Sequence, residues 1–288
     1  MTAPGFWRSP LDPERVMQLP VTHWQDNEQQ QREEQLTVEE PLEIRLNGRS
    51  LAVIMRTPGH DHELACGFLF TEGIIKSLDD VLSIEDAVDA DGLPLANVVD
   101  VTLRSPPAEL ANPAEAPAFQ RHFAVSASCG LCGKNSIADL LCNVPPLTTE
   151  IHDAPISAVT LYDLTARLRA QQDVFSHTGG LHAAGLFTLT GKLYLLREDV
   201  GRHNAVDKLI GHGLLKRALP FSHHILLVSG RTSFEIIQKA LLARIPCIAA
   251  ISAPSSLAVE LAETSGITLV GFLRDRAMNV YTHPERIV

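Results

Sequence analysis

Three short apolar runs constrain the fold of this chain more than any other feature. They span residues 225–228, 247–251 and 267–273, and one segment with a helical pattern separates each run from the next. The runs do not alternate apolar and polar residues, which favours strands covered on both faces and joined by helices, as in a parallel sheet. We therefore expect a three-layer α/β sandwich whose ligand site lies at the carboxyl ends of these strands.

The segments before these runs complete the same domain, which we place at residues 155–288. Residues 160–175 have leucines at helical spacing and predict an amphipathic helix. Two apolar segments, 186–190 and 192–196, flank Thr190-Gly191 and predict a hairpin, and a helix is expected from 203 to about 216.

The N-terminal half predicts a smaller α+β lobe at residues 36–120. Residues 42–56 have an Asn-Gly pair in their middle, which is typical of a tight hairpin turn. A helix is expected from Asp61, with that residue as its cap, and its polar neighbours suit a first turn better than a metal site. Residues 1–35 are polar and proline-containing, so we expect a flexible leader.

Composition excludes several classes of partner. The formal net charge of −10 argues against general binding to nucleic acid or anionic lipid. No apolar run approaches the ~20 residues that a membrane span needs, and the N-terminus does not resemble a secretory signal. The five cysteines are odd in number and lack the spacing of a disulfide framework, which fits a reducing compartment, so a cytoplasmic location is expected.

Cys129 and Cys132 form a C-x-x-C pair in a glycine-rich segment that ends in Lys134. Such a pair serves as half of a zinc site, as a redox dithiol, or as a nucleophile that carries sulfur as a persulfide. No second pair supplies the other zinc ligands, so no metal site is predicted. The three other cysteines lie in apolar runs and are expected to be core residues: Cys66, Cys142 and Cys247. The pair follows a Pro-rich connector, and we expect a mobile loop at 121–154.

Polar turns follow the predicted strands where a ligand would bind. The turn after the first strand contains Ser229, Gly230, Arg231, Thr232 and Ser233, and it offers backbone amides, hydroxyls and a guanidinium to an anion. Residues 252–256 and 271–276 follow the next two strands, and all three turns are expected to meet at one edge. Two further polar segments, 177–182 and 197–204, face the same region, and either His182 or His203 is a candidate proton carrier. They also contribute His177, Gly179 and Arg202 to the expected site.

Several multi-residue motifs together resemble the FdhD family of formate dehydrogenase accessory sulfurtransferases. They are Cys129-Gly-x-Cys132-Gly, His177-Thr-Gly-Gly-x-His182, the segment Glu198 to Lys208, Ser229-Gly-Arg-Thr-Ser233, Phe272-x-Arg274 and Tyr281-Thr-His283. The resemblance runs from residue 36 to the C-terminus. It implies a cytidine-deaminase-like fold and a homodimer. The zinc signature of the deaminases is missing, because Ser128 precedes Cys129 and no H-x-E stands upstream.

The resemblance also implies a function. Cys129 would take sulfur from a cysteine desulfurase as a persulfide, with help from Cys132, and pass it to the molybdenum bis(guanine dinucleotide) cofactor of formate dehydrogenase. The motif match puts part of the cofactor site at Phe272, Leu273, Arg274, Asp275, Arg276 and Ala277. A second hypothesis stays open, in which the protein is a chaperone that delivers this cofactor without covalent sulfur transfer.

Overall fold

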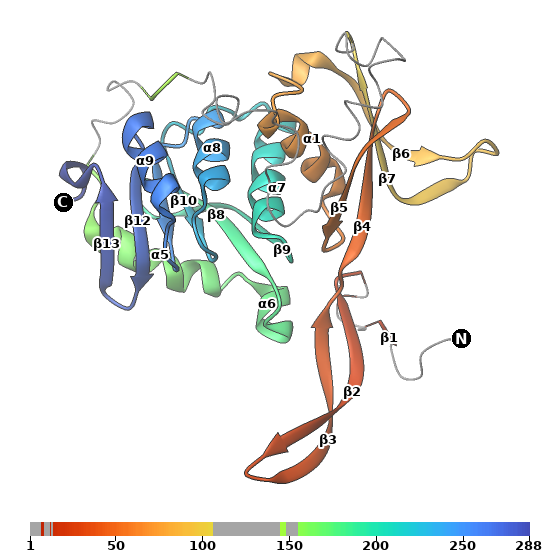
Figure 1. Ribbon diagram of the computed structural model, residues 1–288, viewed down its shortest axis with the longest axis horizontal. Helices are drawn as coiled ribbons and strands as arrows, with labels where there is room; N and C mark the ends of the chain where they lie inside the picture. Colours follow the sequence, from red (N-terminus) through yellow and green to blue (C-terminus); the bar gives the residue numbers. More distant parts are fainter. Residues whose placement is uncertain (1–6, 9–11, 13, 106–144, 148–154) are drawn as a thin grey trace.

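The computed structural model describes residues 7–8, 12, 14–105, 145–147 and 155–288. A six-stranded sheet with helices on both faces occupies the C-terminal half, a smaller lobe lies beside it, and a long two-stranded ribbon projects away from both (Figure 1). Among the described residues, no helix combines the length and the apolarity needed to cross a bilayer.

The large sheet is mixed, with the order β13-β12-β11-β10-β8-β9. Its centre is formed by the three predicted strands, β10 (His224–Val228), β11 (Cys247–Ala250) and β12 (Thr268–Arg274), which pair in parallel. The predicted hairpin is present as β8 (His182–Thr188) and β9 (Leu193–Asp199), and β8 pairs antiparallel with β10. An antiparallel edge strand, β13 (Ala277–Thr282), follows β12 and was absent from the sequence prediction.

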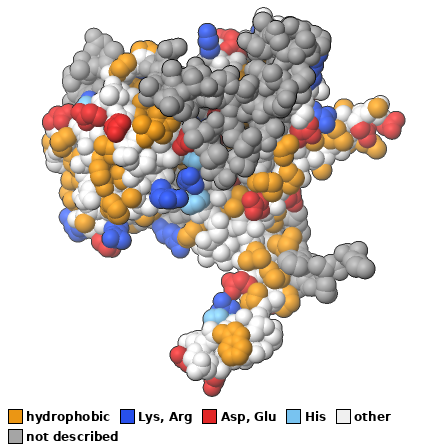
Figure 2. Space-filling model, in the orientation of Figure 1, with side chains coloured by type: hydrophobic (Ala, Val, Ile, Leu, Met, Phe, Trp, Pro, Cys, Tyr) orange, Lys and Arg blue, Asp and Glu red, His pale blue; other side chains and the backbone are white. Residues whose placement is uncertain are grey.

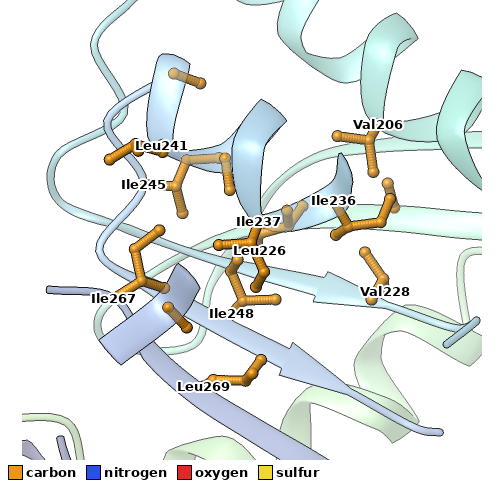
Figure 3. Close-up of a cluster of buried hydrophobic side chains, with 14 of the residues drawn as sticks. Val206, Leu226, Val228, Ile236, Ile237, Leu241, Ile245, Ile248, Ile267 and Leu269 are labelled. Atoms are coloured by element: carbon orange, nitrogen blue, oxygen red, sulfur yellow. The ribbon is translucent and has the colours of Figure 1, made fainter. Parts of the chain in front are cut away.

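Alternate residues of the central strands enter two separate apolar clusters. Leu226 and Ile248 pack toward α7 (Arg202–Leu215), α8 (Phe234–Leu242) and α9 (Ser256–Ser265), as Figure 3 shows for part of this cluster. Ile225 and Cys247 pack on the other face against leucines of α5 (Ala158–Arg169). The three-layer α/β prediction is therefore confirmed. The single helix expected at 160–175 is two helices, because the chain turns after α5 and begins α6 at Asp173–Thr178.

The smaller lobe is a four-stranded sheet with the order β5-β4-β7-β6, covered by α1 (Asp61–Thr71). Its strands are β4 (Glu40–Leu46), β5 (Arg49–Arg56), β6 (Val81–Val88) and β7 (Pro94–Leu103). The Asn-Gly hairpin is confirmed, since Asn47 and Gly48 both have positive φ, at 51° and 75°. The predicted helix cap is wrong: the capping position is His60, and Asp61 instead accepts hydrogen bonds from the Arg56 guanidinium at 2.7 and 3.0 Å.

The prediction of a flexible leader at residues 1–35 is wrong for the described residues 14–35, most of which form two long strands. Strands β2 (Val16–Gln25) and β3 (Glu28–Thr37) pair over ten residues each, and the two-residue β1 (Trp7–Arg8) adds to β2. The turn residues Asp26 and Asn27 have φ of 50° and 65°, which suits a tight hairpin. The sequence did not predict these two strands, because most residues of the ribbon are exposed and no alternation of apolar and polar residues marks them. Figure 2 shows a mainly polar and charged ribbon with an apolar patch toward its far end.

Candidate functional site

The three turns after the parallel strands meet at one edge of the sheet, as predicted. The amide of Thr232 donates to the carbonyl of Ala253 at 3.2 Å, and the amide of Ser255 donates back to Thr232 at 3.0 Å. The amide of Phe272 donates to the carbonyl of Ser252 at 3.2 Å. These bonds join the ends of β10, β11 and β12 into one surface, so a ligand at this edge would contact all three turns.

A cavity of about 820 Å³ opens at this edge. Three residues of the predicted ligand site, Gly179, Ser229 and Asp275, line it together with the candidate proton carrier His182 and with Ile251. The rest of the lining comes from α5, α6 and the segments before and after α6: Tyr162, Asp163, Thr165, Ala166, Arg169, Gln172, Phe175, Gly180 and Leu181. Sequence reasoning missed this wall, because residues of α5 were interpreted only as one apolar face of a helix.

The predicted cofactor segment 272–277 spans the end of β12, the two-residue turn at 275–276 and the start of β13. Phe272 and Asp275 have φ of 51° and 54°, and Arg274 pairs with Ala277. The Arg276 guanidinium carbon lies 5.7 Å from the centre of the Tyr162 ring, so this turn reaches the cavity wall. Leu273 differs from its neighbours because its side chain is fully buried in the core, which leaves only its backbone for a ligand.

The turn after β10 packs tightly against two basic side chains. A β-carbon at Gly230 would lie 3.2 Å from Nδ1 of His182 and 3.4 Å from Cδ of Arg202, so this position favours glycine. The Ser229 hydroxyl accepts a hydrogen bond from the amide of Ala183 at 2.9 Å, which ties the turn to β8. Buried Nε of Arg202 and Oγ1 of Thr232 have no hydrogen-bond partner within the described residues, so each retains the capacity to bind an acceptor.

Other predicted residues lie around this edge with different partners. His177 is exposed on α6, where its Nδ1 lies 2.7 Å from the carbonyl oxygen of Asp173, and Arg231 is exposed in the turn after β10. Ser233 precedes α8, and its hydroxyl lies 3.2 Å from Nε2 of His203. His177, Arg231 and Ser233 are not among the residues that line the cavity.

His203 is unsuited to the proton-carrier role that the sequence allowed. Burial, helped by the positive charges of Arg202 and Lys239, lowers its pKa to about 3. The ring is therefore neutral at physiological pH, and its contact with Ser233 gives it a structural role. His182 lines the cavity. Its pKa is also lowered, chiefly by burial and secondly by the positive charge of Arg202.

Part of the polar segment 197–204, together with Lys208 at the end of the motif Glu198 to Lys208, joins the two lobes instead of facing a ligand. Asp199 and Lys208 are almost completely buried and form an ion pair at 2.7 Å. Asp199 also accepts hydrogen bonds from the amide of Thr57 and from the Asn204 side chain, and Lys208 donates to the carbonyl of Thr57 at 2.8 Å. Thr57 follows β5, so this ion pair fixes the smaller lobe to α7.

The family of this chain is shown by its match to known proteins. Residues 37–288 match the FdhD/NarQ family over most of the chain. The chain belongs to this family.

The sequence resemblance to the FdhD family is thus confirmed. The chain is 50% identical to the "Sulfur carrier protein FdhD" of Mycolicibacterium paratuberculosis, over 93% of this chain and 97% of that protein. It is 45% identical to the protein of the same name from Sulfolobus acidocaldarius, over 95% and 99%. A crystal structure of a putative formate dehydrogenase accessory protein from Desulfotalea psychrophila superposes with a TM-score of 0.72 at 27% identity, covering 95% of this chain and all of that one.

The structure describes two of the five cysteines, and neither is suited to thiol chemistry. Cys66 and Cys247 are fully buried, and burial raises the pKa of each to about 12. The prediction that both are core residues is confirmed. Cys129 and Cys132, the predicted sulfur-carrying pair, lie outside the described residues, as does Cys142.

Proposed function

We propose that this protein is a sulfur carrier that holds sulfur as a persulfide on Cys129. In this proposal it receives the sulfur from a cysteine desulfurase and passes it to the molybdenum bis(guanine dinucleotide) cofactor of formate dehydrogenase. It acts as a homodimer. Family membership is the observation that carries the proposal, because similar proteins along almost their whole length are named sulfur carriers.

The chemistry of the cysteines supports Cys129 as the carrier. A thiol must become a thiolate to attack sulfur, and the high pKa of buried Cys66 and Cys247 opposes this at neutral pH. The glycine-flanked pair with a neighbouring lysine has the residue types that favour a thiolate.

The uptake step balances as a thiol–persulfide exchange. The Cys129 thiolate attacks the terminal sulfur of the desulfurase persulfide, the donor's sulfur–sulfur bond breaks, and the donor leaves as a thiolate. Release of the outer persulfide sulfur as hydrosulfide needs two electrons. The Cys132 thiolate would supply them by attacking the inner sulfur of the persulfide, which is the Cys129 sulfur. This step expels hydrosulfide and leaves a Cys129–Cys132 disulfide that an external dithiol reduces.

The cavity at the strand ends is the site we propose for the cofactor cargo. Its rim includes Asp275 of the segment 272–277, and the turn 229–233 brings hydroxyls and main-chain groups beside it. Arg202 supplies a guanidinium at the same edge, with a buried Nε that has no partner in the described part of the chain. Such groups suit the pyrophosphates of a dinucleotide.

Mass spectrometry of the intact protein tests the carrier role. After incubation with a cysteine desulfurase and L-cysteine, the wild-type protein is expected to gain one sulfur that a reductant removes, and Cys129→Ala is expected to gain none. Cys247→Ala is the matched control and should gain sulfur like the wild type, since its thiol is buried. A Cys129→Ala protein that still activates formate dehydrogenase would instead favour the chaperone hypothesis.

A further inference from the structure

The outer edge of strand β3 is a backbone surface that the proposed function does not use. In the described part of the chain, β3 is an edge strand of the three-stranded sheet β1-β2-β3. Its base contacts α6, where Oγ1 of Thr37 lies 2.8 Å from Oγ1 of Thr178. The outer half of the ribbon projects away from both lobes (Figure 1), and residues 28–33 are all exposed. We refer to residues 28–32 as the ribbon edge.

A ribbon of two strands is a weak structure in water. A sheet becomes stable when it has three or more strands or when a helix packs on it. In this ribbon α6 contacts β3 near the base, and β1 pairs with β2 at Met17 and Gln18. The free N–H and C=O groups of an edge strand are a template for another strand. The ribbon therefore favours a partner strand that is present whenever the protein is folded, and a second copy of this chain meets that requirement.

The turn of the ribbon determines which backbone groups of β3 face outward. The two-residue turn at 26–27 has positive φ at both positions. In such a hairpin the residues that flank the turn, here Gln25 and Glu28, form a hydrogen-bonded pair. Hydrogen-bonded and non-hydrogen-bonded pairs alternate along an antiparallel ladder. The amides and carbonyls of Gln29 and Gln31 therefore point away from β2 and can bond a second strand.

The ribbon edge is self-complementary. Its sequence is Glu-Gln-Gln-Gln-Arg, so two copies that pair antiparallel about a two-fold axis at Gln30 place Glu28 of each copy opposite Arg32 of the other. These side chains lie on one face of the sheet, because residues two apart along a strand point the same way. Arg32 donates to Glu34 of its own strand at 2.7 Å and is 49% exposed, so its remaining N–H groups can bond a second carboxylate.

Other registers of the same pairing are less favourable. A two-fold axis at Gln31 puts Glu28 opposite the partner's Glu34, and an axis at Arg32 puts the two arginines together. An axis at Gln29 leaves only three residues of each strand paired. Opposite charges directly across a sheet stabilise the pairing and like charges destabilise it, so the register with five paired residues and two ion pairs is favoured.

We infer that the ribbon edge pairs antiparallel with the ribbon edge of a second copy, with Gln30 at the two-fold axis and Glu28 and Arg32 in reciprocal ion pairs. The sheet β1-β2-β3 then continues into the same sheet of the partner. This inference names a contact surface for the proposed homodimer, and it rests on the proposed function in that respect alone.

Charge reversal tests the two ion pairs, with self-association of the full-length reduced protein measured by sedimentation velocity over a range of concentrations. Arg32→Glu and Glu28→Arg should each weaken self-association by about tenfold or more, because two attractive pairs become repulsive. The double variant should return to within about threefold of the wild type, which a folding defect cannot do. Lys192→Glu, the same change of charge at an exposed position in the β8–β9 turn, is the control and should associate like the wild type. Unchanged association in the single variants, or no recovery in the double variant, overturns the inference.

A cysteine at the axis tests the register. Mild oxidation of Gln30→Cys should link two copies through a disulfide, seen by mass spectrometry as a peptide joined at position 30 to its own copy, because residues of a non-hydrogen-bonded pair lie close together. Gln29→Cys should link far less, since the residue opposite it is the partner's Gln31. Absence of the link at position 30, or equal linking at both positions, contradicts the register.

The outcomes separate this inference from the proposed function. A wild-type protein that stays monomeric would overturn both the ribbon pairing and the homodimer. A dimer that does not respond to the variants at Glu28, Gln30 and Arg32 would overturn the ribbon pairing alone. Uptake of sulfur by Cys129 is measured separately, so the carrier role can fail while the ribbon pairing stands.

Discussion

The buried ion pair between Asp199 and Lys208 allows a quantitative test of how the segment Glu198 to Lys208 stabilises the fold. The Lys208→Met variant keeps the volume of the side chain and removes its charge, leaving the Asp199 carboxylate buried without its cation. Breaking a buried pair by removing one partner costs about 3–5 kcal/mol. Against a typical stability of about 5–15 kcal/mol, that loss is large.

The hydrogen bonds to Asp199 narrow the expected loss in the free energy of unfolding. Three neutral donors remain after the substitution: the amide of Gly201 at 2.8 Å, the Asn204 side chain at 2.9 Å and the amide of Thr57 at 3.2 Å. They continue to stabilise the carboxylate, so we expect the lower end of the range, about 3 kcal/mol. The lost bond to the Thr57 carbonyl adds a smaller cost and loosens the contact between the lobes.

Urea unfolding followed by circular dichroism at pH 7 measures the effect. Lys192→Met is the control, since Lys192 is exposed, and it should change the free energy of unfolding by about 0.5 kcal/mol or less. The double variant Asp199→Asn with Lys208→Met should be more stable than Lys208→Met alone, because no buried charge remains. A loss below about 1 kcal/mol in Lys208→Met, or no recovery in the double variant, would refute the reasoning.

Three further predictions concern packing, pH and thiol reactivity. Gly67→Ala would put a β-carbon 1.9 Å from the carbonyl oxygen of Asp207, so α1 and α7 must separate and the free energy of unfolding should fall by about 2 kcal/mol or more in urea titrations. His203 has a pKa of about 3 when folded, below its ordinary value of 6.5, so only the unfolded chain binds the proton between these pH values. Its contribution to stability should fall by about 2 kcal/mol between pH 7 and pH 5, and parallel unfolding curves of His203→Gln should lack that part of the decline. Cys66 and Cys247 should resist a thiol reagent in the native protein and react in urea; modification of either without denaturant would contradict their burial.

The sequence by itself determined the central sheet and the meeting of its turns. Residues 225–228, 247–251 and 267–273 are apolar without alternation, and burial on both faces is the local condition that such runs satisfy. Parallel strands place their carboxyl ends at one edge, so the convergence of the turns at Ser229, Ser252 and Gly271 followed from topology alone. The Asn47-Gly48 turn was equally local, because positive φ is a property of those two residue types.

Only the tertiary structure decided the roles of polar residues whose partners are distant in sequence. Asp199 lies in the polar segment 197–204, which the sequence placed at the ligand edge. In the structure it pairs with Lys208, and both residues contact Thr57, more than 140 positions from each along the chain. Tyr162 reaches the cavity because α5 packs on the second face of the sheet, and Phe175 reaches it from α6, which contacts β3. The spacing of apolar residues in the sequence indicates which residues are buried. The partner of a buried charge or of an exposed aromatic ring depends on contacts that form only when the chain folds.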